Sequence, residues 1–212
     1  MARQIEFEGS DEVKRGLDRL GRAFTSARPL MDRVGAYAAS ASVARIRDGM
    51  EPSNAPLTRS YKKGSNTTLR DTGKLQGSIT HRAMPFSAAW GTNEIQARLL
   101  HEGGTVRPKK AKKLAIPAGW RTRRLMRRYG ETPRSCIQRM RESGDYNVWT
   151  SKSGKAVLAK RKTVAGQAKL FVLFVLLDSV TVPSRPFLRL DDRDRREIDR
   201  IARRYLTDQV GP

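Results

Sequence analysis

The uneven distribution of charge along the chain constrains its fold more than any other sequence feature. Residues 103–170 contain 19 Lys and Arg and 3 acidic residues, a net charge of +16, whereas the rest contains 24 basic and 18 acidic residues, a net charge of +6. Positive charges at this density repel one another in a compact domain unless something anionic lies opposite them. We therefore expect one mixed-charge domain, formed by residues 1–102 and 171–212, with a basic, β-rich insertion at 103–170.

The composition of the chain permits a buried core and argues against several protein classes. Apolar residues make up 38% of the 212 residues, and the 17 glycines bring the total to about 46%, which is within the globular range. The single cysteine, Cys136, cannot form an intrachain disulfide, so a reducing compartment is favoured. The longest apolar run, 170–177, is too short to cross a bilayer, and the first residues form no apolar signal segment. We expect a soluble protein without a standard export signal.

Periodic patterns predict helices at both ends of the chain. After a short strand at 4–7, Ser10 suits an N-cap and precedes an apolar stripe, which predicts a helix over 10–24. Pro29 suits the first turn of a second helix that ends near Asp48. Asp191 and Asp192 open a final helix with an apolar stripe at Ile198, Ile201, Ala202, Tyr205 and Leu206.

The middle of the chain indicates short strands and turns. We expect an extended loop at 50–70, then a short helical turn capped by Asp71 and Thr72, two short strands near 86–91, and a short helix at 94–101. A strand over 170–182, apolar on both faces, would be buried in a domain interior or a subunit interface. The fold class is therefore α+β: an N-terminal helical pair and a C-terminal helix packed on a mostly antiparallel sheet.

The residues that carry chemistry are sparse. His81, His101 and Cys136 are too few for a closed zinc site. The stretch 151–155 lacks the first glycine and the final hydroxyl of a phosphate-binding loop. Asp191, Asp192 and Asp194 are better interpreted as helix-capping acids than as metal ligands. We expect no catalytic activity, no cofactor and no metal.

Three segments, in this order, carry a resemblance to a known family. They are LRDTGKLQGSI (69–79), LHEGGTVRPKK continuing to LAIP (100–117), and SVTVPSRPFL (179–188). With the closing helix, they resemble the phage virion morphogenesis, or tail-completion, family of Mu-like and related tailed phages. The resemblance covers about residues 11–206 and is weakest at 119–168.

This resemblance implies a structural virion protein at the neck, assembled in the host cytoplasm. Such proteins form rings at the head-proximal end of the tail, end or complete tube growth, and help join the tail to the head. The expected partners are further copies in a hexameric ring, the tail tube and the connector proteins, with DNA passing through but not specifically bound. Candidate interface residues, each of which could equally hold one subunit's own fold, are Asp71, Thr72, Gly73, Leu75, His101, Gly103, Gly104, Arg185, Pro186 and Phe187.

The basic residues form a second candidate surface. Its members are Lys109, Lys110, Lys112, Lys113, Arg121, Arg123, Arg124, Arg127 and Arg128. The alternative function is a nucleic-acid-binding protein whose insertion contacts phosphates, although no nucleic-acid-binding motif accompanies these clusters. We expect most of these side chains to face protein or point outward, because a strongly cationic channel would retard the DNA moving through it.

Overall fold

The computed structural model describes residues 14–16, 18–19, 21, 25–62, 66–129, 132–142, 147–150, 156–164 and 167–210. The expected strand at 4–7 and much of the expected helix at 10–24 lie outside the described residues. The chain is α+β, as predicted. It divides into two compact units: unit 1 comprises residues 1–48, 73–97 and 187–212, and unit 2 comprises residues 49–72 and 98–186. The division into a domain and an insertion at 103–170 stays a prediction.

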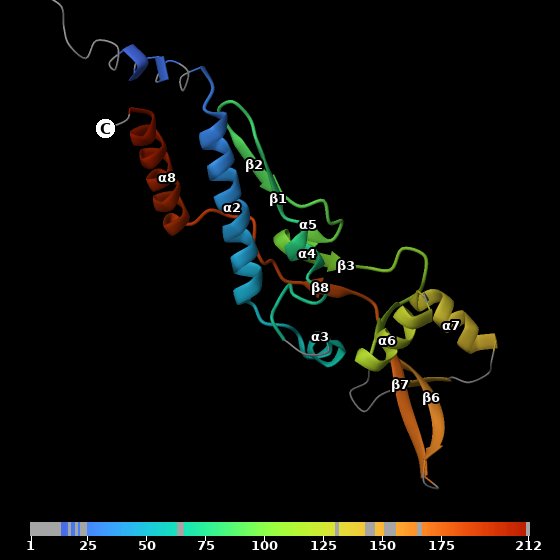
Figure 1. Cartoon of the computed structure of the whole chain (residues 1–212). Coiled ribbons are helices and arrows are strands. Elements are labelled where there is room, and N and C mark those ends of the chain that lie inside the picture. Colours follow the sequence, from blue (N-terminus) through green and yellow to red (C-terminus); the bar gives the residue numbers. More distant parts are fainter. Residues whose placement is uncertain are drawn as a thin grey trace, which may run out of the picture. The chain divides into compact units, whose positions relative to one another are not determined.

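Unit 1 is built around one long helix. Its described elements are α2 (Arg28–Asp48), α4 (Lys74–Gly77), β1 (Thr80–Ala83), β2 (Ala88–Gly91) and α8 (Asp192–Val210). The strands β1 and β2 form an antiparallel hairpin that packs on α2, and α8 also packs along α2 (Figure 1). The predicted second helix ending near Asp48 and the predicted final helix are both confirmed.

Small residues let α2 approach its neighbours closely. Its fully or nearly buried positions include Gly35, Ala38, Ala39 and Ser42. A Cβ at Gly35 would lie 2.8 Å from the His81 ring, so the glycine makes room for β1 against the helix. The alanine-rich sequence of α2 is therefore explained by close packing on the hairpin.

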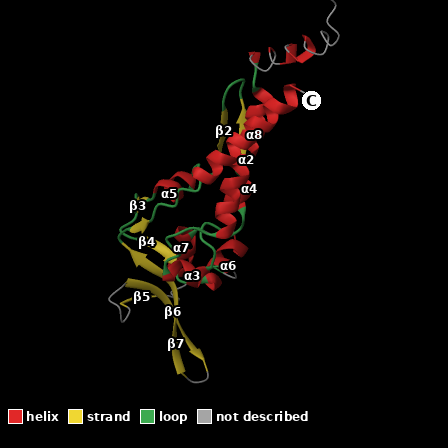
Figure 2. Ribbon diagram, turned by 90° about the vertical axis from the view of Figure 1, so that its left-hand side faces the viewer, coloured by secondary structure: helices red, strands yellow, loops and turns green. Residues whose placement is uncertain are grey.

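Unit 2 contains a four-stranded antiparallel sheet, a separate pair of strands and several short helices. Its elements include α3 (Pro56–Tyr61), β3 (Gly104–Val106), β4 (Leu114–Pro117), α6 (Trp120–Tyr129), α7 (Pro133–Glu142), β5 (Asn147–Thr150), β6 (Ala156–Val164), β7 (Gln167–Leu177) and β8 (Val180–Val182). The sheet order is β4-β7-β6-β5 (Figure 2), and β3 pairs separately with β8 (Figure 1). A further helix, α5 (Ala97–Glu102), ends before Gly103, close to its predicted position.

The core of unit 2 lies between this sheet and the helices α6 and α7. Cys136, Leu158 and Phe174 are buried together, and Met126 and Ile137 pack against them. The stretch predicted to be β-rich therefore also contains two helices. Both helices are rich in arginine and contain few apolar residues, so their apolar stripes are short and the basic residues are the most prominent feature of their sequences.

The strand expected over 170–182 is divided between two sheets. β7 ends at Leu177 and β8 begins at Val180, with Asp178 and Ser179 between them. A register shift after Leu158 leaves one extra residue on β7, so Leu158 lies opposite Phe174 but Ala159 lies opposite Val172. Phe174 is fully buried, whereas Phe171 and Val172 are 40% and 39% exposed. The part of β7 beyond the register shift is therefore not buried on both faces by this chain.

Candidate functional site

The first part of the candidate site is the segment around Arg185, which is 6% exposed. The backbone nitrogen of Arg185 donates to the carbonyl oxygens of Leu100 and His101, at 3.1 and 3.2 Å. Its guanidinium donates from Nε to the carbonyl oxygen of Pro52 at 2.8 Å and from Nη2 to that of Ser53 at 3.2 Å. Arg185 is a predicted interface residue, but the carbonyls that its guanidinium contacts here belong to its own chain.

Gly103 allows the backbone of this segment to lie against the end of α5. Its φ is +77°, in the left-handed region that favours glycine. A Cβ built at Gly103 would lie 2.7 Å from the backbone nitrogen of Ser184. The Ser184 hydroxyl also donates to the carbonyl oxygen of His101 at 2.7 Å, and Gly104 begins the pairing of β3 with β8. The second and third family-like segments thus meet in unit 2.

The loop contacted by Arg185 is fixed by its own polar contacts. The Thr68 hydroxyl contacts both the backbone nitrogen and the carbonyl oxygen of Met50, and Asn54 Nδ2 donates to the carbonyl oxygen of Asn66. Helix α3 forms between these two points, so the prediction of an extended loop over 50–70 is wrong. The local sequence is rich in turn formers, and the helical turn depends on the contacts that close the loop around it.

Asp71 belongs to a charged cluster in unit 2 instead of capping a helix. Its carboxylate binds the guanidinium groups of Arg123 and Arg127 on α6. Lys62 lies nearby and donates from Nζ to the carbonyl oxygens of Thr67 and Arg70. The predicted cap is wrong, because the residue at the start of α4 is Gly73, with φ +81°, and no side-chain hydrogen bond caps that helix.

The electrostatics of this cluster favour a charged Asp71. The hydrogen bond from Arg123 lowers the pKa of Asp71, against a smaller opposing effect of burial, and the charges of Arg127 and Lys62 lower it further. Burial lowers the pKa of the Lys62 ammonium; the charge of Asp71 opposes this shift, and the charges of Arg123 and Arg185 add to it. The cluster therefore holds one carboxylate among several cations.

The remaining candidate interface residues are placed as follows. Leu75 is 4% exposed and Phe187 is fully buried, both in unit 1, while Pro186 is half-buried in unit 2. Thr72 is exposed and His101 is half-buried. The structure thus brings Arg185, His101, Gly103 and Gly104 together in unit 2, and Asp71 contacts α6 of the same unit. Whether any of these residues forms a subunit interface stays a prediction.

The candidate basic surface has two parts. Lys109, Lys110, Lys112 and Lys113 lie exposed between β3 and β4, with Lys113 Nζ 3.0 Å from the Asp178 carboxylate. Arg121, Arg124 and Arg127 are exposed on α6, Arg123 is half-buried against Asp71, and Arg128 lies on the same helix. Their orientation toward protein partners and away from DNA stays a prediction.

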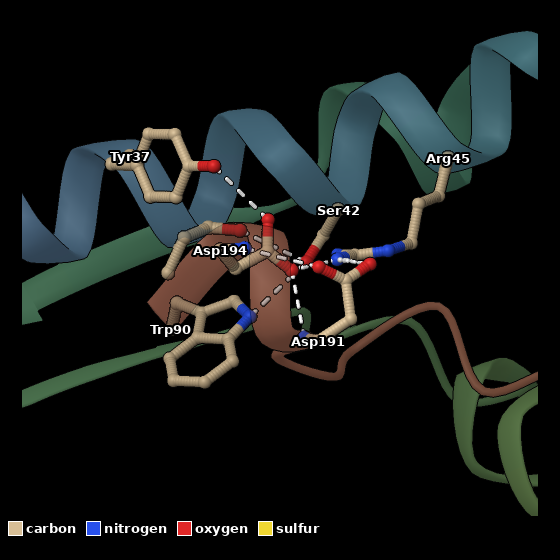
Figure 3. Close-up of polar contacts among 7 residues, drawn as sticks. Tyr37, Ser42, Arg45, Trp90, Asp191 and Asp194 are labelled. Atoms are coloured by element: carbon tan, nitrogen blue, oxygen red, sulfur yellow. Dashed lines mark hydrogen bonds and ion pairs between the residues drawn. The ribbon is translucent and has the colours of Figure 1, made fainter. Parts of the chain in front are cut away.

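A buried polar network in unit 1 was not found from the sequence (Figure 3). Arg45 on α2 forms ion pairs with Asp191 and Asp194, and the Tyr37 hydroxyl donates to Asp194 at 3.0 Å. The side chains of Arg45 and Asp194 are 14% and 5% exposed. Nearby, the indole nitrogen of Trp90 on β2 donates to the Ser42 hydroxyl at 3.1 Å. These contacts fix α8 and β2 to one face of α2.

The acidic residues of this network also cap α8. The backbone nitrogen of Asp194 donates to Asp191, and the backbone nitrogen of Asp191 donates to Asp194, which is a reciprocal capping arrangement. These hydrogen bonds, with that from Arg45, lower the pKa of Asp191 to about 2. The predicted capping role of these two acids is confirmed, and their additional partner, Arg45, could not be inferred from local sequence.

Large apolar side chains are exposed in each unit. In unit 1, Met84 and Phe86 are 39% and 64% exposed at the turn between β1 and β2. In unit 2, the exposed apolar residues of the sheet are Val148, Trp149, Phe171 and Val172. Among the described residues, no cluster of three or more His, Cys, Asp or Glu side chains could hold a metal ion. None of the described helices is long and apolar enough to cross a membrane.

Comparison with known proteins defines the class of the chain as a structural protein of phage assembly. The sequence model of the phage virion morphogenesis family matches residues 9–127, more than half of the chain, and the chain therefore belongs to that family. The match includes the first two family-like segments, whereas the segment at 179–188 lies beyond it. No curated protein and no solved structure matches the chain. Its role is thus virion morphogenesis, and the protein is virion-associated.

Proposed function

We propose that this protein completes the phage tail by forming a ring at its head-proximal end, where it stops tube growth and helps join the tail to the head. The observation that carries the proposal is the family match over residues 9–127. The resemblance of the segments at 69–79, 100–117 and 179–188 to tail-completion proteins supports the more specific role. The proposed partners are further copies of the chain, the tail tube and the connector.

The exposed apolar residues support self-association through two unlike surfaces. One is the β1–β2 turn with Met84 and Phe86, and the other is the face of the unit 2 sheet that carries Trp149 and Val172. When two different surfaces of one chain contact each other, the interface is head-to-tail and can close into a ring. We propose a ring of six subunits, in which each subunit contacts one neighbour through the first surface and the other neighbour through the second.

The arginines of α6 support contacts with other virion proteins. Arg is enriched at protein interfaces, where its planar group binds carboxylates through two hydrogen bonds. Arg121 and Arg124 are exposed on α6, and Arg127, which pairs with Asp71, still has a 55% exposed side chain. Neutralising Arg121 and Arg124 should weaken the joining of the phage head to the tail most at low salt, and the difference from wild type should shrink as salt is raised, because salt screens exposed charges.

The decisive experiment is electron microscopy of phage that lack the protein. We expect filled heads, unjoined tails and tails of abnormal length, with DNA packaging largely intact. Infectious particles of normal appearance would contradict the proposal.

Light scattering during size-exclusion chromatography tests ring formation by the purified protein. Replacing Met84 and Phe86 with Ser should yield smaller species, whereas the control Ile95→Ser should leave the ring intact. Ile95 suits the control because it is fully exposed and lies outside that turn. A monomeric wild-type protein that also fails to bind isolated tails would argue against the ring.

A further inference from the structure

The β6–β7 hairpin extends beyond the strands on either side of it. β5 pairs with β6 only as far as Ala159, and β4 pairs with β7 only as far as Phe174. Among the described residues, five further pairs, from Lys160 opposite Phe171 to Val164 opposite Gln167, join only β6 and β7. We call residues 160–164 and 167–171 the basic ribbon. At a rise of about 3.3 Å per residue, its length is about 16 Å.

The basic ribbon carries positive charge only. Its charged residues are Lys160, Arg161, Lys162 and Lys169, and it contains no Asp or Glu. The register sets Lys162 directly opposite Lys169, and like charges in that position destabilise a strand pair. A two-stranded ribbon in water is also marginally stable by itself. An anionic partner would therefore stabilise the ribbon, and the ribbon alone supplies none.

The type of basic residue in the ribbon favours a nucleic acid over an acidic protein as its partner. Three of the four charged residues are lysines, which are depleted at protein–protein interfaces, whereas arginine is enriched there. The lysine ammonium is a compact point charge, so it can neutralise a phosphate without the fixed geometry of a paired carboxylate. The basic ribbon differs in this respect from α6, whose five charged residues are all arginines.

The two-stranded form of the ribbon also suits a duplex. Successive strand residues belong to opposite faces, so Lys160 and Lys162 belong to one face and Arg161 to the other. The phosphates of a duplex border both sides of each groove, and the major groove admits a two-stranded β-ribbon. We propose that the basic ribbon binds duplex DNA through its phosphates, without reading the base sequence.

Fluorescence anisotropy with a labelled duplex tests this proposal on the full-length protein. The test variant carries K160Q, R161Q, K162Q and K169Q. The matched control carries R82Q, R193Q, R196Q and R204Q, four exposed arginines outside the candidate basic surface, so both proteins lose four positive charges from an initial +22. Titrations at a series of NaCl concentrations give the dissociation constant and its salt dependence, and two duplexes of unrelated sequence test for base readout.

The expected result is a selective loss in the ribbon variant. Each phosphate contact contributes about 0.9 to the slope of log affinity against log salt, so four lost contacts reduce the slope by about 3.6. We expect at least a tenfold weaker dissociation constant in this variant, a slope within about one unit of wild type in the control, and equal affinity for both duplexes. A milder variant, K162Q with K169Q, relieves the repulsion between the strands and should show about half the loss of slope.

Other outcomes would overturn the proposal. Equal losses in the ribbon variant and the control would mean that binding follows net charge, and a wild-type protein that binds no duplex would exclude the site. Poly-glutamate tests for an acidic protein partner: a ribbon variant that loses poly-glutamate binding but keeps DNA binding would assign the ribbon to such a partner. Circular dichroism of the milder variant shows whether a loss reflects binding or unfolding. These readouts do not require a ring, so they test the ribbon independently of tail completion.

Discussion

Arg185 donates from Nε to the carbonyl oxygen of Pro52 at 2.8 Å, although 133 residues separate the two in the sequence. The same guanidinium contacts Ser53, and the backbone nitrogen of Arg185 contacts the end of α5. One residue thus connects three segments of unit 2. Arg185 is buried, and these backbone oxygens provide hydrogen bonds to its charged guanidinium in place of water.

We predict that Arg185→Lys destabilises the protein by about 2 kcal/mol, because lysine cannot reproduce the two separate guanidinium contacts and hydrogen bonds to a charged group contribute about 1.5–3 kcal/mol each. Urea unfolding followed by circular dichroism measures the change. Arg107→Lys is the matched control, since Arg107 is exposed. An unchanged unfolding midpoint for Arg185→Lys would show that the contacts add nothing to stability.

Three glycine-to-alanine substitutions should change the stability of the protein to different extents. Gly103→Ala combines a positive φ with a Cβ 2.7 Å from Ser184 N, so we expect a loss of more than about 2 kcal/mol. Gly73→Ala has a positive φ but no atom within 4 Å of the new Cβ, so about 1 kcal/mol is expected. Gly77→Ala has neither and should be neutral or slightly stabilising. Thermal unfolding ranks the three, and a Gly73→Ala variant less stable than Gly103→Ala would contradict the close approach.

Asp194→Asn should be strongly destabilising. The substitution leaves Arg45 with a weaker partner in a mostly buried position, and breaking such a pair costs about 3 kcal/mol. Asp192→Asn is the control two residues away, because the Asp192 side chain is 82% exposed and pairs with the exposed Arg195; it should cost at most about 0.5 kcal/mol. Equal unfolding midpoints for the two variants in urea would argue against the network.

The acid sensitivity of the protein should depend on Asp191. Its pKa is lowered in the folded state, so its carboxylate contributes stability above its ordinary value of 3.8, and this contribution is lost as the pH falls toward about 2. Asp191→Asn should therefore lose stability less steeply across that interval. Urea midpoints measured at several pH values test this, and a variant with the same acid slope as wild type would assign the sensitivity to other groups.

Two phenylalanines of β7 should respond differently to truncation. Phe174 is fully buried between the sheet and the α6–α7 pair, so Phe174→Ala should cost about 3–5 kcal/mol. Phe171 is 40% exposed beyond the register shift, so Phe171→Ala should cost less than about 1 kcal/mol. Phe174→Asp should give insoluble protein, because it buries an unpaired charge. A soluble Phe174→Asp variant with native circular dichroism would place the core elsewhere.

Elements with strong local signals could be predicted from the sequence. α2 includes Pro29 in its first turn and ends at Asp48, before the positive-φ Gly49, and α8 begins between the reciprocal capping acids Asp191 and Asp194. In both cases the signals lie in the helix or directly beside it. The short helix before Gly103 carries its stop signal in the same way.

Features that depend on distant residues could not be predicted. Asp71 looked like a cap because it precedes a helical turn, and only the position of α6 reveals its pairing with Arg123. Helix α3 likewise depends on contacts between the two ends of its loop, such as Met50 with Thr68. Arg45 gave no signal at all, because its acidic partners are almost 150 residues away. Side chains of opposite charge are common in this sequence, so only the folded structure shows which of them form pairs.

The two residues between β7 and β8 have a mechanical consequence. β7 belongs to the four-stranded sheet and β8 to the β3–β8 pair, and only Asp178 and Ser179 separate them. Fully extended, two residues span about 7 Å, whereas the seven residues between β3 and β4 reach about 25 Å. Tension applied to one sheet would therefore reach the other through Asp178 and Ser179 first, while the longer, lysine-rich connection stays slack.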